Sequence, residues 1–548
     1  MTLADPVPRC VLSSRRAPTA RFRRARRGSS IMEYGLSMSL IGVVAVSAAL
    51  LLNDQMGFLI ERTNARLDRT NPVLLGQAQG VDPECLDPAN AGTVGNFFWE
   101  GCSEMYIASQ ADIEAAASAR VGGDESFEIV FDGIAYTFAY SGRDVFTGQL
   151  TSLDEMFRDT AFDGDIGYWD TSGVTSMRET FRDAVDFDRD LARWDVSGVS
   201  DMTRAFMGAS SFNQPLESWN VGAVTDMEGM FRDAVAFDQD LAGWNTLGVQ
   251  DMQQMFRGAS AFTGDIEAWN VSTVIDMSEM FRDATSFAGS LSGWDVGVVT
   301  DFDGMFREAD AFNGDIGGWD TSSAVSMRRM FLYTDSFDRS LSGWDVSGVL
   351  DMSEMFRGSV FDSAISGWDV SNVLTMSGMF RNADEFDRNI NGWTPSSVSD
   401  FSRMFQFADE FDRNLDGWDV SAGQDFSRMF DGAREFDGNV SSWDVSSATT
   451  MAAMFRGTDE FDGALSSWDV GAVTDMSAMF EDADAFDGAI GGWDTASVTG
   501  MTAMFRSADD FDQDLSGWCV STILSAPLDF DLNAFSWSQP RPPWGATC

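Results

Sequence analysis

Pairs of carboxylates two residues apart recur along the chain, and they are the side chains best suited to chemistry. Such pairs can bind Ca²⁺, which takes several carboxylate oxygens, or serve acid–base catalysis. Catalysis is disfavoured because the pairs recur in copy after copy, an active site needs one distinctive constellation, and the chain has no His. We therefore expect no enzyme and no catalytic residue. The acids that would serve as Ca²⁺ ligands are Asp163, Asp165, Asp188, Asp190, Asp238 and Asp240.

The same acids would form rows of like charge once the repeats stack. Such rows repel unless cations or arginines lie between them. A column of arginines can offset part of this charge, and no complete calcium-loop motif is present. We expect a solvated acidic face with no metal site and no cofactor, and a calcium-dependent scaffold is the alternative. The arginine column consists of Arg158, Arg182, Arg232, Arg257, Arg282 and Arg307.

The overall charge narrows the class of partner. The chain has a formal net charge of -50, from 86 acidic and 36 basic residues among 548. Phosphate recognition needs a cationic surface, so a nucleic-acid partner is excluded. The hydrophobic share of 44% is too high for a disordered acidic chain, and the acids must cover a folded object.

These side chains are positioned by a repeat that a column of tryptophans marks. Successive members stand 25 residues apart, with a single 24-residue step from Trp344 to Trp368. A fixed period in this range predicts a solenoid over residues 151–520, in which each unit buries its apolar face against the next. The column consists of Trp169, Trp194, Trp219, Trp244, Trp269, Trp294, Trp319, Trp344, Trp368, Trp393, Trp418, Trp443, Trp468, Trp493 and Trp518.

One unit predicts a short strand and a short helix. Met202, Ala205, Phe206 and Ala209 stand at i, i+3, i+4 and i+7, the buried stripe of a helix that Asp201 or Ser200 would cap. Trp and Val two residues apart would share one side of a strand. The fold class is an α/β repeat solenoid of the leucine-rich-repeat kind. The Trp column belongs to its core rather than to a carbohydrate-stacking strip, and the missing residue of the 24-residue unit falls in a loop.

The repeat resembles that of BspA-like bacterial surface proteins, a relative of the leucine-rich repeat. The shared pattern is Trp-Asp-Val-Ser-x-Val-Thr-Asp-Met followed by Met-Phe-x-x-Ala-x-x-Phe, and it recurs through residues 151–520. The resemblance implies cell-surface display, adhesion and recognition of an extracellular protein or glycan. It does not imply one ligand.

The N-terminal residues predict insertion into the bacterial inner membrane. Residues 1–28 carry eight Arg, and the apolar stretch Ile31–Leu52 has 22 residues, enough to cross a bilayer. By the positive-inside rule the basic leader stays in the cytoplasm and the C-terminus lies outside. Residues 29–68 are expected to form one helix. Glu33 lies inside the apolar stretch, where an isolated carboxylate costs about 2.5–3.5 kcal/mol and needs a partner.

The leader and the start of this helix resemble a type IVb prepilin of the Flp type. The resemblance rests on the basic leader, Gly28, Glu33, Tyr34 and the apolar run. It implies that a prepilin peptidase cuts after Gly28, that Ser29 becomes the mature N-terminus, and that Glu33 pairs with the new ammonium of a neighbouring pilus subunit. Because Flp pilins are usually little more than this helix, the chain is more like a minor or tip subunit. An uncleaved signal anchor and a secretory signal peptide are the alternatives.

Two caps are expected around the solenoid, at residues 69–150 and 521–548. The first contains a plausible hairpin, Phe127 to Tyr140, around Asp132-Gly133. Export suits disulfides, and we expect local pairing within each cap, although four cysteines allow three connectivities. The candidates are Cys85, Cys102, Cys519 and Cys548.

The sequence therefore predicts an exported, surface-displayed protein for adhesion or recognition, a pilin-like stem carrying an acidic solenoid. A statically anchored structural surface protein with no pilus role is the alternative.

Overall fold

A computed structural model describes part of the chain, and the described residues form one compact unit within Gly80–Cys548. The predicted leader and stem, residues 1–68, lie outside the described residues, and so does Cys548. The predictions for the leader and stem stay predictions. Among the helices that the structure does describe, none is long and apolar enough to span a bilayer. The described residues are 83–95, 102, 105–118, 128–137 and 145–547.

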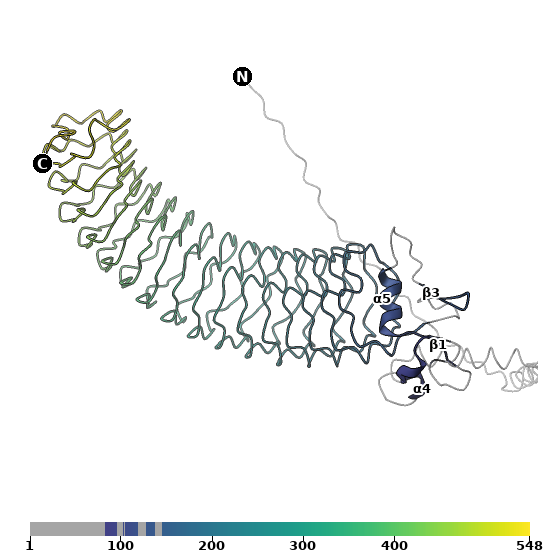
Figure 1. The fold of residues 1–548 in the computed structure, drawn as a ribbon. Coiled ribbons are helices and arrows are strands. Elements are labelled where there is room, and N and C mark those ends of the chain that lie inside the picture. The colour runs from purple at the N-terminus through teal and green to yellow at the C-terminus, as the bar shows by residue number, and fades with distance from the viewer. Residues whose placement is uncertain (1–82, 96–101, 103–104, 119–127, 138–144, 548) are drawn as a thin grey trace, which may run out of the picture. The chain divides into compact units, whose positions relative to one another are not determined.

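Short helices and strands precede the coils (Figure 1). Strand β2 pairs antiparallel with β1 and parallel with β5, so the sheet order is β1-β2-β5. The predicted hairpin is confirmed as β3 and β4, which pair antiparallel. Its turn residues Asp132 and Gly133 have φ values of 51° and 77°, as a two-residue primed turn requires. The elements are α4 Pro83–Leu86, η1 Pro88–Asn90, β1 Thr93–Val94, β2 Tyr106–Ile107, α5 Gln110–Ser118, β3 Glu128–Phe131, β4 Ile134–Thr137 and β5 Val145–Phe146.

Helix α5 begins beside the first coil and supplies one of its backbone partners. The Gln110 side chain donates from Nε2 to the Ser152 carbonyl at 2.8 Å, and its Oε1 accepts from the Ser152 N–H at 3.3 Å. A side-chain amide thereby stands in for the peptide of a preceding coil. Tyr106 and Ile113 extend the solenoid core into this region. The segment therefore covers the first apolar face, as a solenoid end requires.

The repeat region is a stack of coils joined by parallel backbone pairing (Figure 1). One bridge per coil links Ser152 to Ser176 and continues coil by coil to Gly500. Beside each bridge, alternate N–H groups donate to the next coil, as from Arg204 to the Glu228 carbonyl at 2.8 Å. Backbone groups of a buried wall must be paired, and here the neighbouring coil pairs them.

The predicted short helix is wrong, because the segment from Met202 to Ala209 forms consecutive β-turns. The N–H groups of Ala205 and Ala209 bond to carbonyls three residues back, at 3.1 Å each. Arg204 and Gly208 have φ values of 54° and 68°, which no α-helix allows. The N–H groups of Arg204, Phe206 and Gly208 bond to carbonyls of the next coil and cannot reach back four residues. The buried stripe was predicted correctly, since the turns also point Met202, Ala205 and Ala209 inward.

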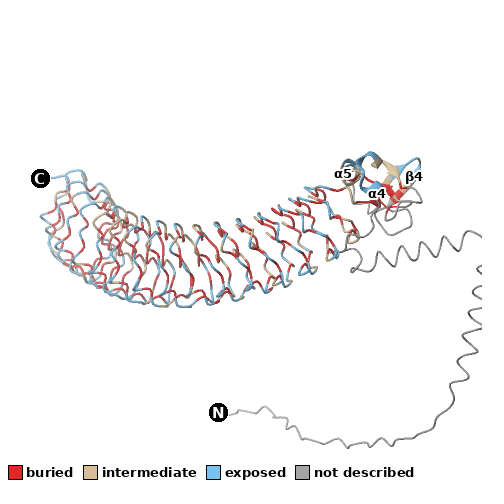
Figure 2. Ribbon diagram, turned by 90° about the horizontal axis from the view of Figure 1, so that it is seen from below, coloured by how far each residue is buried: buried red, intermediate tan, exposed pale blue. Residues whose placement is uncertain are grey.

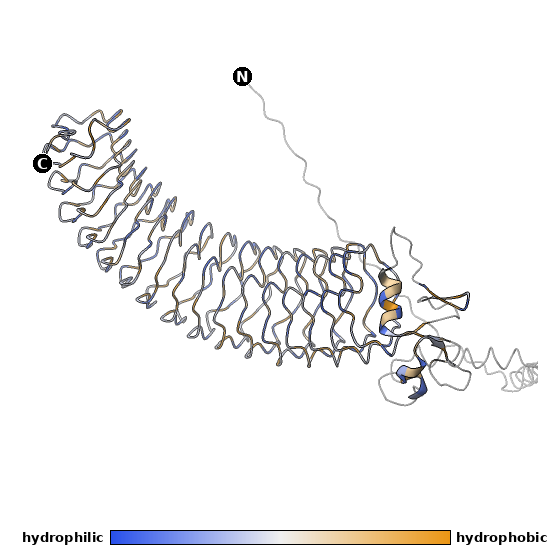
Figure 3. Cartoon of the chain, viewed as in Figure 1, coloured by the Kyte–Doolittle hydropathy of each residue, from blue (hydrophilic) through white to orange (hydrophobic). Residues whose placement is uncertain are grey.

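The predicted strand is also misplaced. The backbone around each Trp-x-Val is irregular, and the parallel ladder lies seven residues later, at Asp201 in the coil of Trp194. Asp201 caps no helix; its Oδ1 accepts the Thr203 N–H at 2.9 Å. Trp194 and Val196 are nevertheless both buried, as their spacing predicted. Buried and exposed residues alternate along each coil, and so do hydrophobic and hydrophilic ones (Figures 2 and 3).

Stacked aromatic rings fill the core. Members of the Trp column are 0–4% exposed, and Trp319 stacks on Trp344 with ring centroids 6.2 Å apart. Each indole from Trp194 onward donates its N–H to a carbonyl of the preceding coil, as Trp344 does to Ile316 at 2.9 Å. A buried indole needs such a partner. The column therefore packs the core and offers no surface for sugar.

The 24-residue unit preserves the stack, as predicted. Phe356 and Phe361 stand five residues apart and still stack at 4.2 Å, while Trp344 and Trp368 remain parallel within 3°. The turn that most other coils make between these two Phe positions is absent here. The deletion is absorbed at the surface.

The coil pattern continues beyond residue 520. Ala503 and Phe505 donate to the carbonyls of Leu528 and Phe530 at 3.0 and 2.8 Å. Trp544 then packs edge-on against Phe530, with centroids 4.8 Å apart, and covers the end of the core.

Candidate binding surface

An acidic row runs along the coils six residues before each Trp, and the structure gives it a backbone role. The Oδ1 atom of Asp163 accepts the N–H of Asp188 at 3.2 Å, and Asp462 accepts the N–H of Asp487 at 3.0 Å. Asn213 takes the same place and accepts the N–H of Asp238 at 2.9 Å. An acceptor oxygen is therefore what the position requires, and a negative charge is optional.

Arginines relieve part of the repulsion in this row. Arg189 pairs with Asp163 at 2.6 Å, and Arg413 pairs in the same way with Asp387. Around Asp462, a glycine follows each of Asp437, Asp462 and Asp487, and no arginine takes that position. The predicted row of like charges exists, and its compensation is local.

The predicted Ca²⁺ ligands hold backbone N–H groups. Asp165 and Asp190 accept from N–H groups two residues ahead, at 3.2 and 2.9 Å. Asp188 accepts from the next coil at 3.0 Å, and so does Asp240 at 3.1 Å. Asp238 accepts from Thr263 at 2.8 Å. Within the described ranges, no group of three or more acidic, Cys or His side chains is arranged to hold a metal ion.

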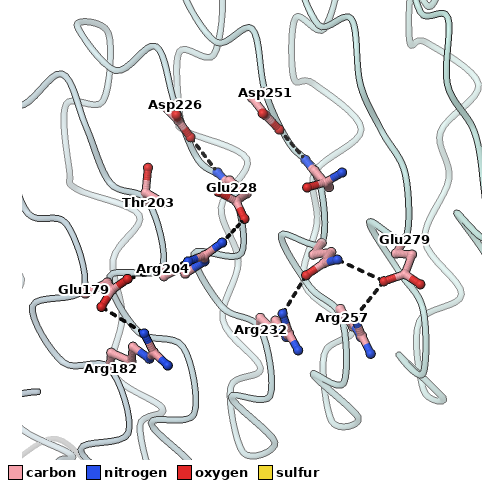
Figure 4. Close-up of polar contacts among 12 residues, drawn as sticks. Glu179, Arg182, Thr203, Arg204, Asp226, Glu228, Arg232, Asp251, Arg257 and Glu279 are labelled. Carbon is pink, nitrogen blue, oxygen red and sulfur yellow. Dashed lines mark hydrogen bonds and ion pairs between the residues drawn. The ribbon is translucent and has the colours of Figure 1, made fainter. Parts of the chain in front are cut away.

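A second surface carries the predicted arginine column. We call it the turn face and define it by the residues 9, 10, 13 and 14 positions after each Trp. Arg182 forms an ion pair with Glu179 at 3.0 Å, and further along Arg257 forms one with Glu279 at 2.7 Å (Figure 4). Glu179 is only 4% exposed and also meets Arg158 at 2.8 Å. Acids and arginines from successive coils thus neutralise each other on this part of the face.

The residues that form the parallel bridges between coils, seven positions after each Trp, make up a bridge row. The charges of half-buried acids in this row are less well compensated. Burial raises the pKa of Asp251 above its ordinary value, although the Gln253 N–H opposes this, and the charges of Asp226 and Asp276 raise it further. Four acids that directly follow a Trp, Asp320, Asp345, Asp369 and Asp444, have a lowered pKa instead. Hydrogen bonds from the Ser322 hydroxyl and N–H lower the pKa of Asp320.

Two exposed aromatic residues on the turn face escaped the sequence analysis. Tyr333 and Phe407 are 38% and 39% exposed, and each stands where most coils carry Asp, Asn or Gly. The signal was present in the sequence, since a bulky ring replaces a small or polar residue. It was hidden because the period is dominated by buried aromatics. A shallow polar depression also lies in the acidic row, lined by Asn389, Asn391, Asp412, Arg413, Asn414, Asp437 and Gly438.

The cysteines of the described region are paired. Cys85 and Cys102 form a disulfide across a sequence separation of 17, which is the local pairing considered for the first cap. Both are fully buried. Cys519 is also disulfide-bonded, while its expected partner Cys548 lies outside the described residues.

Stacked coils with a buried aromatic core and turn-built surfaces define a repeat solenoid. A family described as "Mycoplasma protein of unknown function, DUF285" matches residues 151–268, 251–361, 333–442, 358–465 and 424–536. These matches together span well over half of the chain, and the chain belongs to this family. No curated protein matches the chain.

Several solved structures show some likeness to this chain. The TLR13–ssRNA13 complex is 11% identical, with a TM-score of 0.17, and the match covers 67% of this chain and 56% of that one. A leucine-rich-repeat protein of Leptospira interrogans is 7% identical, with a TM-score of 0.18, over 68% of this chain and 82% of that one. The functional domain of InlJ from Listeria monocytogenes, which includes a cysteine ladder, is 8% identical with a TM-score of 0.19, over 62% and 73%.

Proposed function

We propose that this protein is displayed on a bacterial surface, where its solenoid recognises other macromolecules in adhesion. One observation carries the proposal. Positions that face the core keep the same residue types from coil to coil, while the turn face changes from Glu279 to Arg329 to Arg403. A rigid scaffold with a variable surface suits recognition, because side chains are held in place before a partner arrives.

The resemblance to BspA-like proteins supports this role. The resemblance of the leader to a Flp-type prepilin supports a minor or tip subunit, inserted in the inner membrane through residues 31–52 and processed by a prepilin peptidase. The buried disulfide between Cys85 and Cys102 agrees with an oxidising location outside the cytoplasm. We propose binding rather than catalysis, because the paired carboxylates recur in several coils and form no single distinctive constellation.

The alternative is a static structural protein with no pilus role. Mass spectrometry of the mature N-terminus tests the pilin part, since processing leaves Ser29 first. An intact leader would remove the pilin role and leave adhesion open. Surface display is tested by protease digestion of intact cells, and a C-terminus protected inside the cell would refute the proposal.

A calcium-dependent scaffold is disfavoured by the partners that the acids already have. Asp188 and Asp238 each hold an N–H group of the next coil. Adding Ca²⁺ or a chelator should therefore leave the melting temperature unchanged. A rise with Ca²⁺ would restore the scaffold hypothesis.

A further inference from the structure

The net charge of the turn face changes sign along the solenoid. In the coils that follow Trp319 to Trp443 it carries seven arginines and two acids. The protein as a whole carries a net charge of -50, whereas the turn face of these coils carries a net positive charge. The arginines are Arg328, Arg329, Arg357, Arg381, Arg403, Arg428 and Arg456, and the acids are Glu354 and Asp431.

The two acids already form ion pairs with arginines of the turn face. Glu354 pairs with Arg329 at 2.7 Å and with Arg357 at 2.5 Å. Asp431 is 1% exposed and accepts two hydrogen bonds from Arg456, at 2.7 and 2.8 Å. Neither acid forms an ion pair with Arg381, Arg403 or Arg428 in the described part of the chain.

Arg381 and Arg403 lack such partners. The side chains of Arg381, Arg403 and Arg428 form no ion pair or hydrogen bond with another residue of the described part of the chain. The Nε atom of Arg381 is buried without a hydrogen-bond acceptor. Burial lowers the pKa of Arg381, and the like charges of Arg357 and Arg403 lower it further. An anion placed here would relieve this repulsion, and the guanidinium fork can pair with a carboxylate through two parallel hydrogen bonds.

An exposed aromatic ring lies at each end of the stretch of turn face that contains Arg381 and Arg403. Tyr333 lies across Gly358 of the next coil so closely that an added Cβ would fall 2.3 Å from its ring. Phe407 lies across Gly432 in the same way, also at 2.3 Å. Each ring is therefore held flat on the backbone, and Arg357 stands 5.4 Å from the centroid of Tyr333. Three coil steps separate the rings, roughly 14 Å at the usual strand spacing.

We propose that the strip from Tyr333 to Phe407 binds a carboxylate-bearing polysaccharide. Its carboxylates meet Arg381 and Arg403, and the apolar faces of its sugars pack on the two rings. Arginines that lie between two exposed rings three coil steps apart fit an extended polymer. Acids border the strip, among them Asp384, Asp409 and Asp400, and restrict an anionic polymer to it. A nucleic acid, with its dense phosphate charge, would meet those acids.

This inference rests on the proposed function and names its ligand class. The test measures binding of the full-length protein in detergent to immobilised polygalacturonate, with sulfated and neutral dextran as parallel arms. We expect binding to polygalacturonate that weakens with salt. The double change R381Q and R403Q should weaken it about tenfold or more, and Y333L with F407L should weaken it while keeping the apolar contact with the glycines.

The matched control is R282Q, at the same position of an earlier coil, where Arg282 is paired with Glu279 at 2.6 Å. It should leave binding unchanged. Equal loss in the control, binding to sulfated dextran alone, or no binding to polygalacturonate would overturn the inference. Adhesion of intact cells to matrix proteins is measured separately. Adhesion without polygalacturonate binding would refute this ligand class and leave the proposed function standing.

Discussion

The acidic row offers a substitution whose effect on stability should change sign with salt. Asp462 accepts the N–H of Asp487 at 3.0 Å, and its own N–H donates to Asp437 at 3.3 Å. Changing Asp462 to Asn keeps the acceptor oxygen and removes the charge. The hydrogen bond weakens by about 1 kcal/mol when its acceptor becomes neutral. Against this, the repulsion from two neighbouring carboxylates disappears.

The magnitude of that repulsion follows from the coil spacing. Two unit charges about 5 Å apart in water repel by about 0.8 kcal/mol, so two neighbours contribute about 1.6 kcal/mol. At 10 mM salt about 1.4 kcal/mol survives screening, and at 1 M about 0.3 kcal/mol. The Asn variant should therefore be more stable by about 0.4 kcal/mol at low salt and less stable by about 0.7 kcal/mol at high salt.

The assay is urea unfolding followed by tryptophan fluorescence, since the Trp column is buried and urea adds no charge. The matched control is Asp387→Asn, because Asp387 is ion-paired with Arg413. This change removes an attraction, and it should destabilise at low salt as well as at high salt. If the Asp462 variant shifted stability by the same amount at both salt concentrations, repulsion along the row would be refuted.

Three further changes test the core, the bridge row and the first cap. Trp344→Phe leaves a buried carbonyl without its 2.9 Å indole partner and should cost about 2–4 kcal/mol in urea unfolding; a cost under about 0.5 kcal/mol would contradict the indole ladder. Because the pKa of Asp251 is raised in the fold, its ionisation costs stability above its ordinary pKa. Asp251→Asn should therefore melt higher at pH 7, an advantage that vanishes below about pH 4, and a variant that melts lower at pH 7 would contradict this. Cys102→Ser opens the disulfide with Cys85 and should cost about 3 kcal/mol by loop-closure entropy, seen as faster proteolysis near residue 102, whereas an unchanged digestion pattern would contradict it.

Much of the architecture follows from the period of the sequence repeat. The spacing of Trp319, Trp344 and Trp368 determines how many coils there are and where the short one lies, because each coil must present one ring to the next. The side chains that face inward follow from the same register. The Asp132-Gly133 hairpin was also predictable, since only a few residue pairs adopt two positive φ values in succession.

Only the tertiary structure decided how the backbone runs between these fixed points. Met202 to Ala209 carries the apolar spacing of a helix, yet alternate N–H groups of this segment bond to the next coil. That partner lies more than twenty residues away in the sequence, and no local pattern reveals it. Glycines such as Gly229 and Gly304 share their column with Arg204 and were a sign of positive φ in the sequence, as were those in the column of Gly208.

The turn face was likewise decided by stacking. Whether Arg282 finds an acid while Arg381 does not depends on which side chains the neighbouring coils bring within a few ångströms. The sequence by itself determined the repeat and its buried faces, because burial follows from residue type and period. Backbone path, ion pairing and the exposed strip required the stacked coils, because each depends on groups that only the three-dimensional register brings together.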